Sequence, residues 1–439
     1  MDTATGIEAA LGAGAGGPRQ MEAAYQRALK ANQAQAFTAE TERRFAAAPD
    51  DVLLAAWHYR LAEKAVAEGE GRRVPWRLAV PLAAVLSLIF MVLTSAIFDL
   101  PPQGPPLLLL AWAPVGACAL ILYLALASGR ERQSLWIAAP LLALLVYATW
   151  FAVADQAMQQ YRTLMILHLP LAAWAAVGFY LLKRSLDDRD PFAFLLKSAE
   201  VVLTGGIFLG AGGLFVAITT GIFSAIGINI PDVIMRALSA GVAGLIPALA
   251  VAVVYDADLP PAMQGFGQGL ARLISTLGRV FLPLTLLVGL VYLVSIPFNF
   301  ARPFEQREVL VIYNAMLFSV MGLIVICTPV TGDDLKAEIQ GWLRRGLMLL
   351  AAMTVVVSLY AMSATIYRTA LGGLTINRIT VIGWNSINIV LLCVYLVRQA
   401  RAGAAGWLAA SHATFRWGML AYAVWTVLLS MLMPLLIAR

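Results

Sequence analysis

Charged residues are scarce in this chain. Aspartate, glutamate, lysine and arginine together make up only 13% of its 439 residues, whereas a soluble globular domain carries about 25%. Hydrophobic residues make up 61%, and the mean hydropathy is +0.79. These values exclude an ordinary soluble protein. Repeated apolar runs, each close to the roughly 20 residues that a bilayer requires, predict an all-α, polytopic integral membrane protein.

Cysteine and histidine are also rare, at three residues each. The cysteines lie inside apolar runs without a pairing pattern, which argues against a disulfide framework or a cysteine-ligated zinc site (Cys118, Cys327 and Cys393). The histidines are far apart, and no catalytic triad, zinc-protease motif or phosphate loop is present. We therefore predict no metal, no cofactor and no enzymatic activity.

Acidic and basic residues are missing from the centres of the apolar runs, which disfavours a pump that works through a charged intramembrane relay. Eleven spans are predicted, at 78–98, 106–127, 135–154, 163–182, 201–222, 234–254, 280–298, 309–329, 347–366, 379–397 and 414–436. The fifth is the least regular, because its glycines are compatible with a broken or re-entrant helix. Gly206 and Gly210 form a GxxxG motif there, which is typical of close helix packing in lipid.

The chain divides by composition into three parts. Residues 1–77 form a cytoplasmic region of amphipathic helices, in which Pro49-Asp50-Asp51 marks a helix start. Residues 78–197 hold about four spans, and residues 198–439 hold about seven. Segments near 261–279 and 333–345 are amphipathic and predict two helices that lie in the membrane interface. Four residues in and after the first segment recur 68 positions later, which suggests a duplicated unit (Gly278, Leu282, Tyr292 and Ser295; Gly346, Leu350, Tyr360 and Ser363).

The net charge of +6 is better explained by membrane topology than by nucleic-acid binding. With the N-terminus inside, the inner connections hold twice as many lysines and arginines as the outer segments, in agreement with the positive-inside rule. An odd number of spans then places the C-terminus outside. Abundant alanine and arginine favour a bacterial source, and hence the bacterial plasma membrane.

The turn between the ninth and tenth spans is unusually polar. Gly372 and Gly373 permit the left-handed backbone that ends a helix, and Thr375 can cap the next helix. Arg378 then lies in a first helical turn, where the helix dipole disfavours a cation, and on the predicted outer side. Arg368 precedes the turn. These two arginines are the residues that a simple connection does not explain.

Three amides inside spans would be costly if they faced lipid (Asn314, Asn385 and Asn388). They fit two interpretations, either hydrogen bonds between helices or a polar cavity. His168, inside the fourth span, is expected to be hydrogen-bonded to a neighbouring helix. The candidate ligand-binding residues are those of the turn together with the tenth span (Arg368, Thr375, Asn377, Arg378, Asn385 and Asn388). Two arginines at a helix N-terminus suit a lipid phosphate or a carboxylate.

The turn also resembles the signature of an uncharacterised family of bacterial multi-pass membrane proteins that carry a domain of unknown function. In that signature an arginine is followed, after a few residues, by Gly-Leu-Thr-x-x-Arg, in which Asn or Asp is frequent between the threonine and the second arginine. Here Arg368, Gly373-Leu374-Thr375, Asn377 and Arg378 match it in order, although Leu371-Gly372 precede Gly373 where the family usually has an aromatic residue and a single glycine. The resemblance covers the chain from about residue 198 onward and implies a fold and a membrane location, without an activity.

Two functions therefore compete. The first is a transporter or flippase-like protein that handles an anionic small molecule or lipid. The second is a structural or regulatory membrane subunit that docks a protein partner through its cytoplasmic helices. Both have membrane lipids as partners, and neither involves nucleic acid.

Overall fold

The computed structural model describes residues 18–30, 34–48, 51–68, 74–100, 105–129, 131–154, 158–183, 185, 187–267, 269–332 and 335–437. Throughout these ranges the regular structure is helical, with no β-strand. The chain divides into two compact units, Met1–Arg73 and Val74–Arg439.

The first unit contains three helices, α2 (Pro18–Lys30), α3 (Ala34–Ala47) and α4 (Val52–Glu68). Three aromatic rings form the centre of its small core, with Tyr25 and Phe37 centroids 5.4 Å apart and Trp57 within 5.8 Å of both. The carboxylate of Asp51 accepts hydrogen bonds from the backbone N–H groups of Leu53 and Leu54, so it caps α4. Pro49 and Asp50 of the expected start signal lie outside the described residues.

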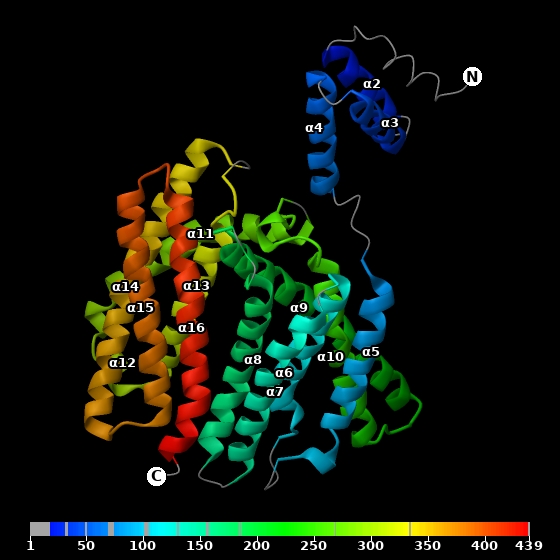
Figure 1. The fold of residues 1–439 in the computed structure, drawn as a ribbon. Coiled ribbons are helices and arrows are strands. Elements are labelled where there is room, and N and C mark those ends of the chain that lie inside the picture. The colour runs from blue at the N-terminus through cyan, green and yellow to red at the C-terminus, as the bar shows by residue number, and fades with distance from the viewer. Residues whose placement is uncertain are drawn as a thin grey trace. The chain divides into compact units, whose positions relative to one another are not determined.

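The second unit contains the eleven described helices that are long and apolar enough to cross a membrane. They are α5 (Trp76–Leu93), α6 (Leu108–Ala127), α7 (Glu131–Ala154), α8 (Gln159–Leu182), α9 (Asp190–Ala225), α10 (Asp232–Val254), α11 (Gly269–Ser295), α13 (Arg307–Cys327), α14 (Ala337–Gly372), α15 (Ile376–Ala402) and α16 (Trp407–Ile437). Shorter elements are α12 (Arg302–Glu305) and the 3-10 turns η1 (Ala96–Phe98), η3 (Pro261–Met263) and η4 (Pro297–Asn299). Figure 1 shows the helices of this unit side by side. The prediction of an all-α polytopic protein is confirmed.

Three spans, α9, α11 and α14, begin ten or eleven residues before their predicted starts. The expected interfacial helices are not separate elements, because residues 269–279 begin α11 and residues 337–345 begin α14. No proline interrupts α14, so its amphipathic start continues into the span as one helix of 36 residues, about 54 Å long against a hydrocarbon core of about 30 Å. The fifth span is likewise continuous, since α9 runs unbroken through its glycines.

The glycines of α9 pack differently from the prediction. A Cβ at Gly206, Gly210 or Gly213 would meet no atom within 4 Å, so the GxxxG face touches no other helix among the described residues. Gly212 of α9 faces α10, where a Cβ would clash with the side chain of Val242. The close approach of two backbones is made by Gly244 of α10, where a Cβ would lie 2.6 Å from the Cα of Ser87 in α5.

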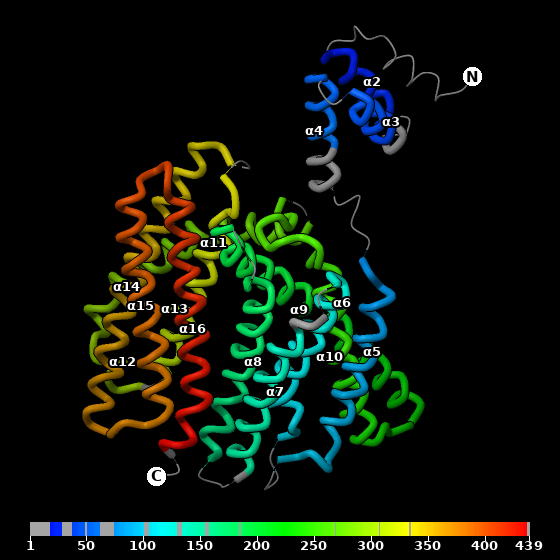
Figure 2. Tube along the Cα trace, viewed as in Figure 1, coloured from blue at the N-terminus to red at the C-terminus, as the bar shows by residue number. Residues whose placement is uncertain are grey.

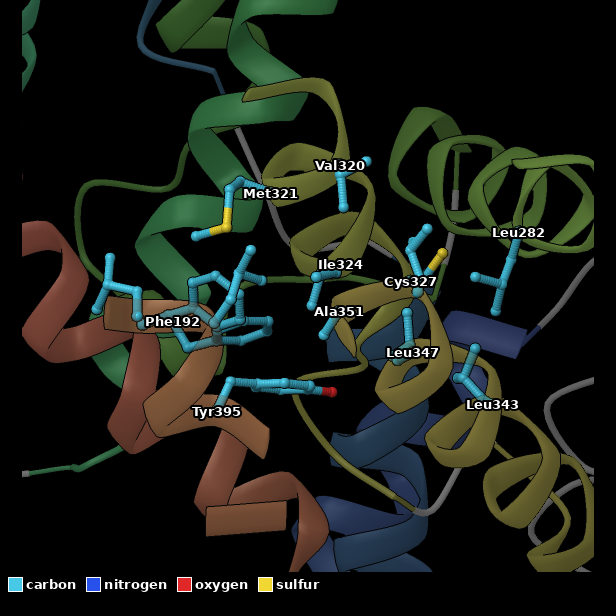
Figure 3. Close-up of a cluster of buried hydrophobic side chains, with 14 of the residues drawn as sticks. Phe192, Leu282, Val320, Met321, Ile324, Cys327, Leu343, Leu347, Ala351 and Tyr395 are labelled. Carbon is cyan, nitrogen blue, oxygen red and sulfur yellow. The ribbon is translucent and has the colours of Figure 1, made fainter. Parts of the chain in front are cut away.

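The second half of the unit is organised around one buried cluster, shown in Figure 3. Phe192 of α9, Leu282 of α11, Ile324 of α13, Leu347 of α14 and Tyr395 of α15 all belong to it, and each is at most 1% exposed. Next to this cluster α14, α15 and α16 lie side by side, as Figure 2 shows. This packing fixes the ends of α13, α14 and α15 relative to one another.

Two connections share a hydrogen-bond pattern. The side-chain amide of Gln264 donates to the carbonyls eight and five residues before it, at 2.8 and 3.0 Å. Gln340 does the same in the connection before α14, at 2.7 and 3.0 Å. The two glutamines do not follow the expected 68-residue repeat, because Gln264 precedes α11 while Gln340 lies inside α14. Ser295 and Ser363 do follow it, and each donates to the carbonyl three residues earlier at 2.7 Å, but Ser295 ends α11 whereas Ser363 lies inside α14.

Candidate functional site

The polar turn between α14 and α15 has the local structure that its sequence indicates. Gly373 follows the last residue of α14 with φ of 75°, a left-handed conformation that favours glycine. The hydroxyl of Thr375 accepts a hydrogen bond from the backbone N–H of Arg378 at 3.4 Å, as an N-cap of α15. The glycine and the threonine therefore have structural roles in the turn.

Arg378 folds back over this turn instead of opposing the dipole of its own helix. Its guanidinium donates a hydrogen bond to the carbonyl of Gly373 and lies in the space above Gly372. A cation is favourable at a helix C-terminus, where carbonyl groups lack partners. Arg378 thus stabilises the end of α14, which offsets its unfavourable place at the start of α15.

Arg368 has an equivalent role at another helix end. Its guanidinium donates to the carbonyl of Glu305 at 3.0 Å and contacts the carbonyl of Phe304 at 3.5 Å. Both carbonyls lie at the end of α12. The two arginines therefore each cap a short backbone segment on either side of the same space.

That space is a pocket of about 400 Å³ lined by residues of α8, α13, α14 and α15. Its polar lining consists of Gln160, Asn314, Thr365, Arg368, Thr375, Asn377 and Arg378, and its apolar lining of Leu310, Val311 and Val381. No aspartate or glutamate is among these residues. The pocket is therefore a cationic, hydrogen-bonding site at the end of the helices.

Guanidinium groups suit phosphate and carboxylate because their five N–H donors form a planar fork that matches two oxygen atoms. Each arginine uses only one terminal nitrogen, Nη1, in its contacts with the helix ends. The N-terminus of α15 adds partial positive charge at the same place. The arrangement can bind one anionic group between Arg368 and Arg378, with Asn377 and Thr375 beside it.

Four of the six candidate residues thus line one pocket, and two do not. The amide of Asn385 donates to the Oδ1 of Asn314 at 2.8 Å, and the Oδ1 of Asn388 accepts from the hydroxyl of Tyr422. Both asparagines are buried, with 3% and 0% exposure. They lie deeper along α15 than the pocket and make hydrogen bonds between helices.

His168 is held on both ring nitrogens. Its Nδ1 lies 2.8 Å from the carbonyl of Leu164, and its Nε2 lies 3.0 Å from the indole nitrogen of Trp384. Since the indole can only donate and the carbonyl can only accept, the ring is the neutral tautomer that carries its proton on Nδ1. The histidine therefore joins α8 to α15.

Two features of the structure could not be predicted from local sequence. Gln160 of α8 lines the pocket although it is more than two hundred residues from Arg368 in sequence. The sequence shows it only as a polar residue at the end of a span. Lys197 and Glu200 form a buried ion pair at 2.6 Å, with side chains 5% and 11% exposed. The pair is buried because α9 begins at Asp190, well before the predicted span.

In the part of the chain that the structure describes, histidine, cysteine, aspartate and glutamate form no group of three that could hold a metal ion. Comparison with family models, with curated proteins and with solved structures found no match to this chain.

Proposed function

We propose that this multi-pass membrane protein binds an anionic group, a phosphate or a carboxylate, in the pocket between α13, α14 and α15, and that it acts as a transporter or flippase-like protein. One observation carries the proposal. Arg368 and Arg378 cap the ends of two different helices, yet both line one pocket. No acidic residue lines the pocket with them. A purely structural pair of capping arginines would not require an open, polar space of about 400 Å³ between them.

The residues have distinct roles in this proposal. Arg368 and Arg378 neutralise the anion and donate hydrogen bonds to its oxygens. Asn377, which is exposed in the first turn of α15, adds a donor of adjustable direction. Thr375 and Thr365 add hydroxyls on either side of the turn.

Binding of glycerol phosphate to the purified full-length protein tests the proposal. Asn377→Asp places a carboxylate in the pocket without removing either arginine, and it is expected to weaken binding about tenfold or more, because like charges at close range repel. Asn377→Ser is the matched control and should bind nearly as the wild type does. Arg401→Gln, at the exposed far end of α15, controls for the loss of a positive charge.

Arg378→Gln is expected to weaken binding by about tenfold to a hundredfold, since a hydrogen bond to a charged group contributes roughly 1.5 to 3 kcal/mol. Because Arg378 also caps α14, its thermal unfolding is measured in parallel. Equal binding by Asn377→Asp and Asn377→Ser, in folded protein, would remove the basis for an anion site.

The location is also proposed. The distribution of lysine and arginine supports the bacterial plasma membrane, with the N-terminus in the cytoplasm and the C-terminus outside. The pocket then opens on the outer face.

A second function is favoured by one observation, the compact first unit with its own aromatic core. In this alternative, α2, α3 and α4 dock a protein partner, and the membrane part is a structural or regulatory subunit. Removal of residues 1–70 should then abolish co-purification of that partner while the membrane part stays folded. Purification of the full protein without a stoichiometric partner would count against it.

A further inference from the structure

An aromatic layer lies one helical turn deeper than the pocket. Trp384 is its centre, with ring centroids 5.7 Å from Phe318 and 5.2 Å from Tyr422, in edge-to-face contacts. Phe318 is four residues after Asn314 of the pocket lining on α13, and Trp384 is three residues after Val381 of the lining on α15. Residues three or four apart on a helix lie on the same face. The layer therefore lies about one helical turn below the pocket lining.

Beyond this layer lies a second cavity, of about 560 Å³, which is lined by Trp384, Phe318 and Tyr422 on the side of the pocket. The rest of its wall is almost entirely apolar, with residues from α6, α8, α9 and α10 such as Trp112, Pro170, Val201 and Pro247. Its volume is in the range of about 300 to 1,000 Å³ found for small-molecule sites. The aromatic layer thus separates a cationic pocket from an apolar cavity.

The cavity extends toward the opposite ends of the helices. Gln160, in the first turn of α8, lines the pocket, so the last turn of α8 and the start of α9 lie at the other end. Lys197, about 10 Å from the start of α9, also lines the cavity. Its ammonium is held there by Glu200 and by the carbonyl of Gly265, both at 2.6 Å.

Polar atoms without partners lie beside the aromatic layer. The Oδ1 of Asn385 and the Nδ2 of Asn388 are buried and have no hydrogen-bond partner, although the other half of each amide is bonded. An unpaired polar atom at membrane depth is unfavourable, because lipid offers no hydrogen bonds. The Nδ2 of Asn388 needs an acceptor, and an ester carbonyl of a glycerolipid supplies one.

We infer that the ligand of the pocket is an anionic membrane lipid and not a soluble anion, an inference that rests on the proposed function. Its phosphate binds Arg368 and Arg378, an ester carbonyl accepts a hydrogen bond from the Nδ2 of Asn388, and an acyl chain occupies the apolar cavity. Trp384 lies in the layer between the two spaces, so the chain passes from one to the other when this side chain moves. The sequence of cationic, amide and apolar surfaces matches the sequence of chemical groups along a phospholipid.

Photocrosslinking tests this inference. The full-length protein is placed in phosphatidylcholine nanodiscs with a trace of phosphatidic acid that carries a diazirine near the end of its acyl chain. Labelled peptides are expected to include the cavity wall, especially the segments that contain the buried Ala117 and Ala173. Diazirine-labelled phosphatidylcholine is the control, and it should label exposed lipid-facing positions such as Leu214 and Val288 instead.

Val201→Trp fills the cavity and is expected to lower cavity labelling by phosphatidic acid about tenfold, with glycerol phosphate binding unchanged. Val201→Phe gives a milder filling if the tryptophan variant does not fold, and Leu214→Trp, on the exposed face of α9, is the matched control. Identical labelling patterns for the two lipids would overturn the inference. If glycerol phosphate still binds in an Asn377→Asp-sensitive manner, the pocket remains an anion site and only the lipid is excluded. Loss of both signals overturns the proposed function as well.

Discussion

The indole nitrogen of Trp384 lies 3.0 Å from Nε2 of His168, a hydrogen bond between residues 216 positions apart. It joins α15 to α8 at the aromatic layer below the pocket. Both side chains are buried, so neither partner can be replaced by water without a change in packing. The bond holds Trp384 in the aromatic layer, where it also lines the apolar cavity.

Trp384→Phe should therefore destabilise the protein and open the layer. Loss of the bond leaves Nε2 of His168 without a donor, and hydrogen bonds between membrane helices contribute roughly 0.6 to 1.7 kcal/mol. A double-mutant cycle with His168→Phe, followed by thermal unfolding in detergent, measures the coupling. Additive effects of the two substitutions would show that the contact carries no energy.

Gly244→Ala and Gly210→Ala should have opposite effects. A methyl group at Gly244 meets the backbone of Ser87, which cannot move aside easily, so overpacking of about 1 to 3 kcal/mol is expected. At Gly210 the space is open, and alanine should stabilise the helix by up to about 1 kcal/mol. Thermal unfolding of the two variants compares them directly. A large loss of stability in Gly210→Ala would mean that the GxxxG face packs against something in the folded protein.

The two glutamine contacts predict similar losses. Gln264→Leu and Gln340→Leu each leave two loop carbonyls without a side-chain donor, which should cost roughly 1 to 3 kcal/mol. Glu338→Gln, at an exposed position near the second loop, is the control and should be nearly neutral. A clear loss in only one of the glutamine variants would show that the two side chains do not stabilise their loops to the same extent.

Labelling with a membrane-impermeant maleimide checks the orientation in intact cells. Cysteine introduced for the exposed Thr375 should react from outside, because the α14–α15 turn is expected on the outer face. Ala404→Cys, at the opposite end of α15, should react only after the membrane is permeabilised. The reverse pattern would place the pocket in the cytoplasm and the N-terminus outside.

The spans were predictable because apolar runs report directly on burial in lipid. Their ends were not, because the amphipathic segments at the starts of α11 and α14 belong to the same continuous helices as the spans that follow them. Local pattern also identified the turn that holds Thr375 and Arg378, since capping depends on a few neighbouring residues. It did not identify Gln160, which reaches the pocket only through the packing of α8.

The contacts of the arginines were also not predictable from local sequence. Sequence alone places Arg378 at the wrong end of a helix dipole, while the structure directs its guanidinium to the C-terminus of the preceding helix. Asn385 likewise does not line the pocket, because its amide is directed to Asn314 on the neighbouring helix α13. Such contacts depend on the relative rotation of α13 and α15, which no local pattern specifies.

The most direct test of the anion pocket is a density map of the full-length protein in nanodiscs that contain phosphatidic acid. The account predicts a phosphate peak between the guanidinium groups of Arg368 and Arg378, at about 2.8 Å from each, and its loss in Asn377→Asp. A pocket that holds only water in the wild-type map, at saturating phosphatidic acid, would contradict it.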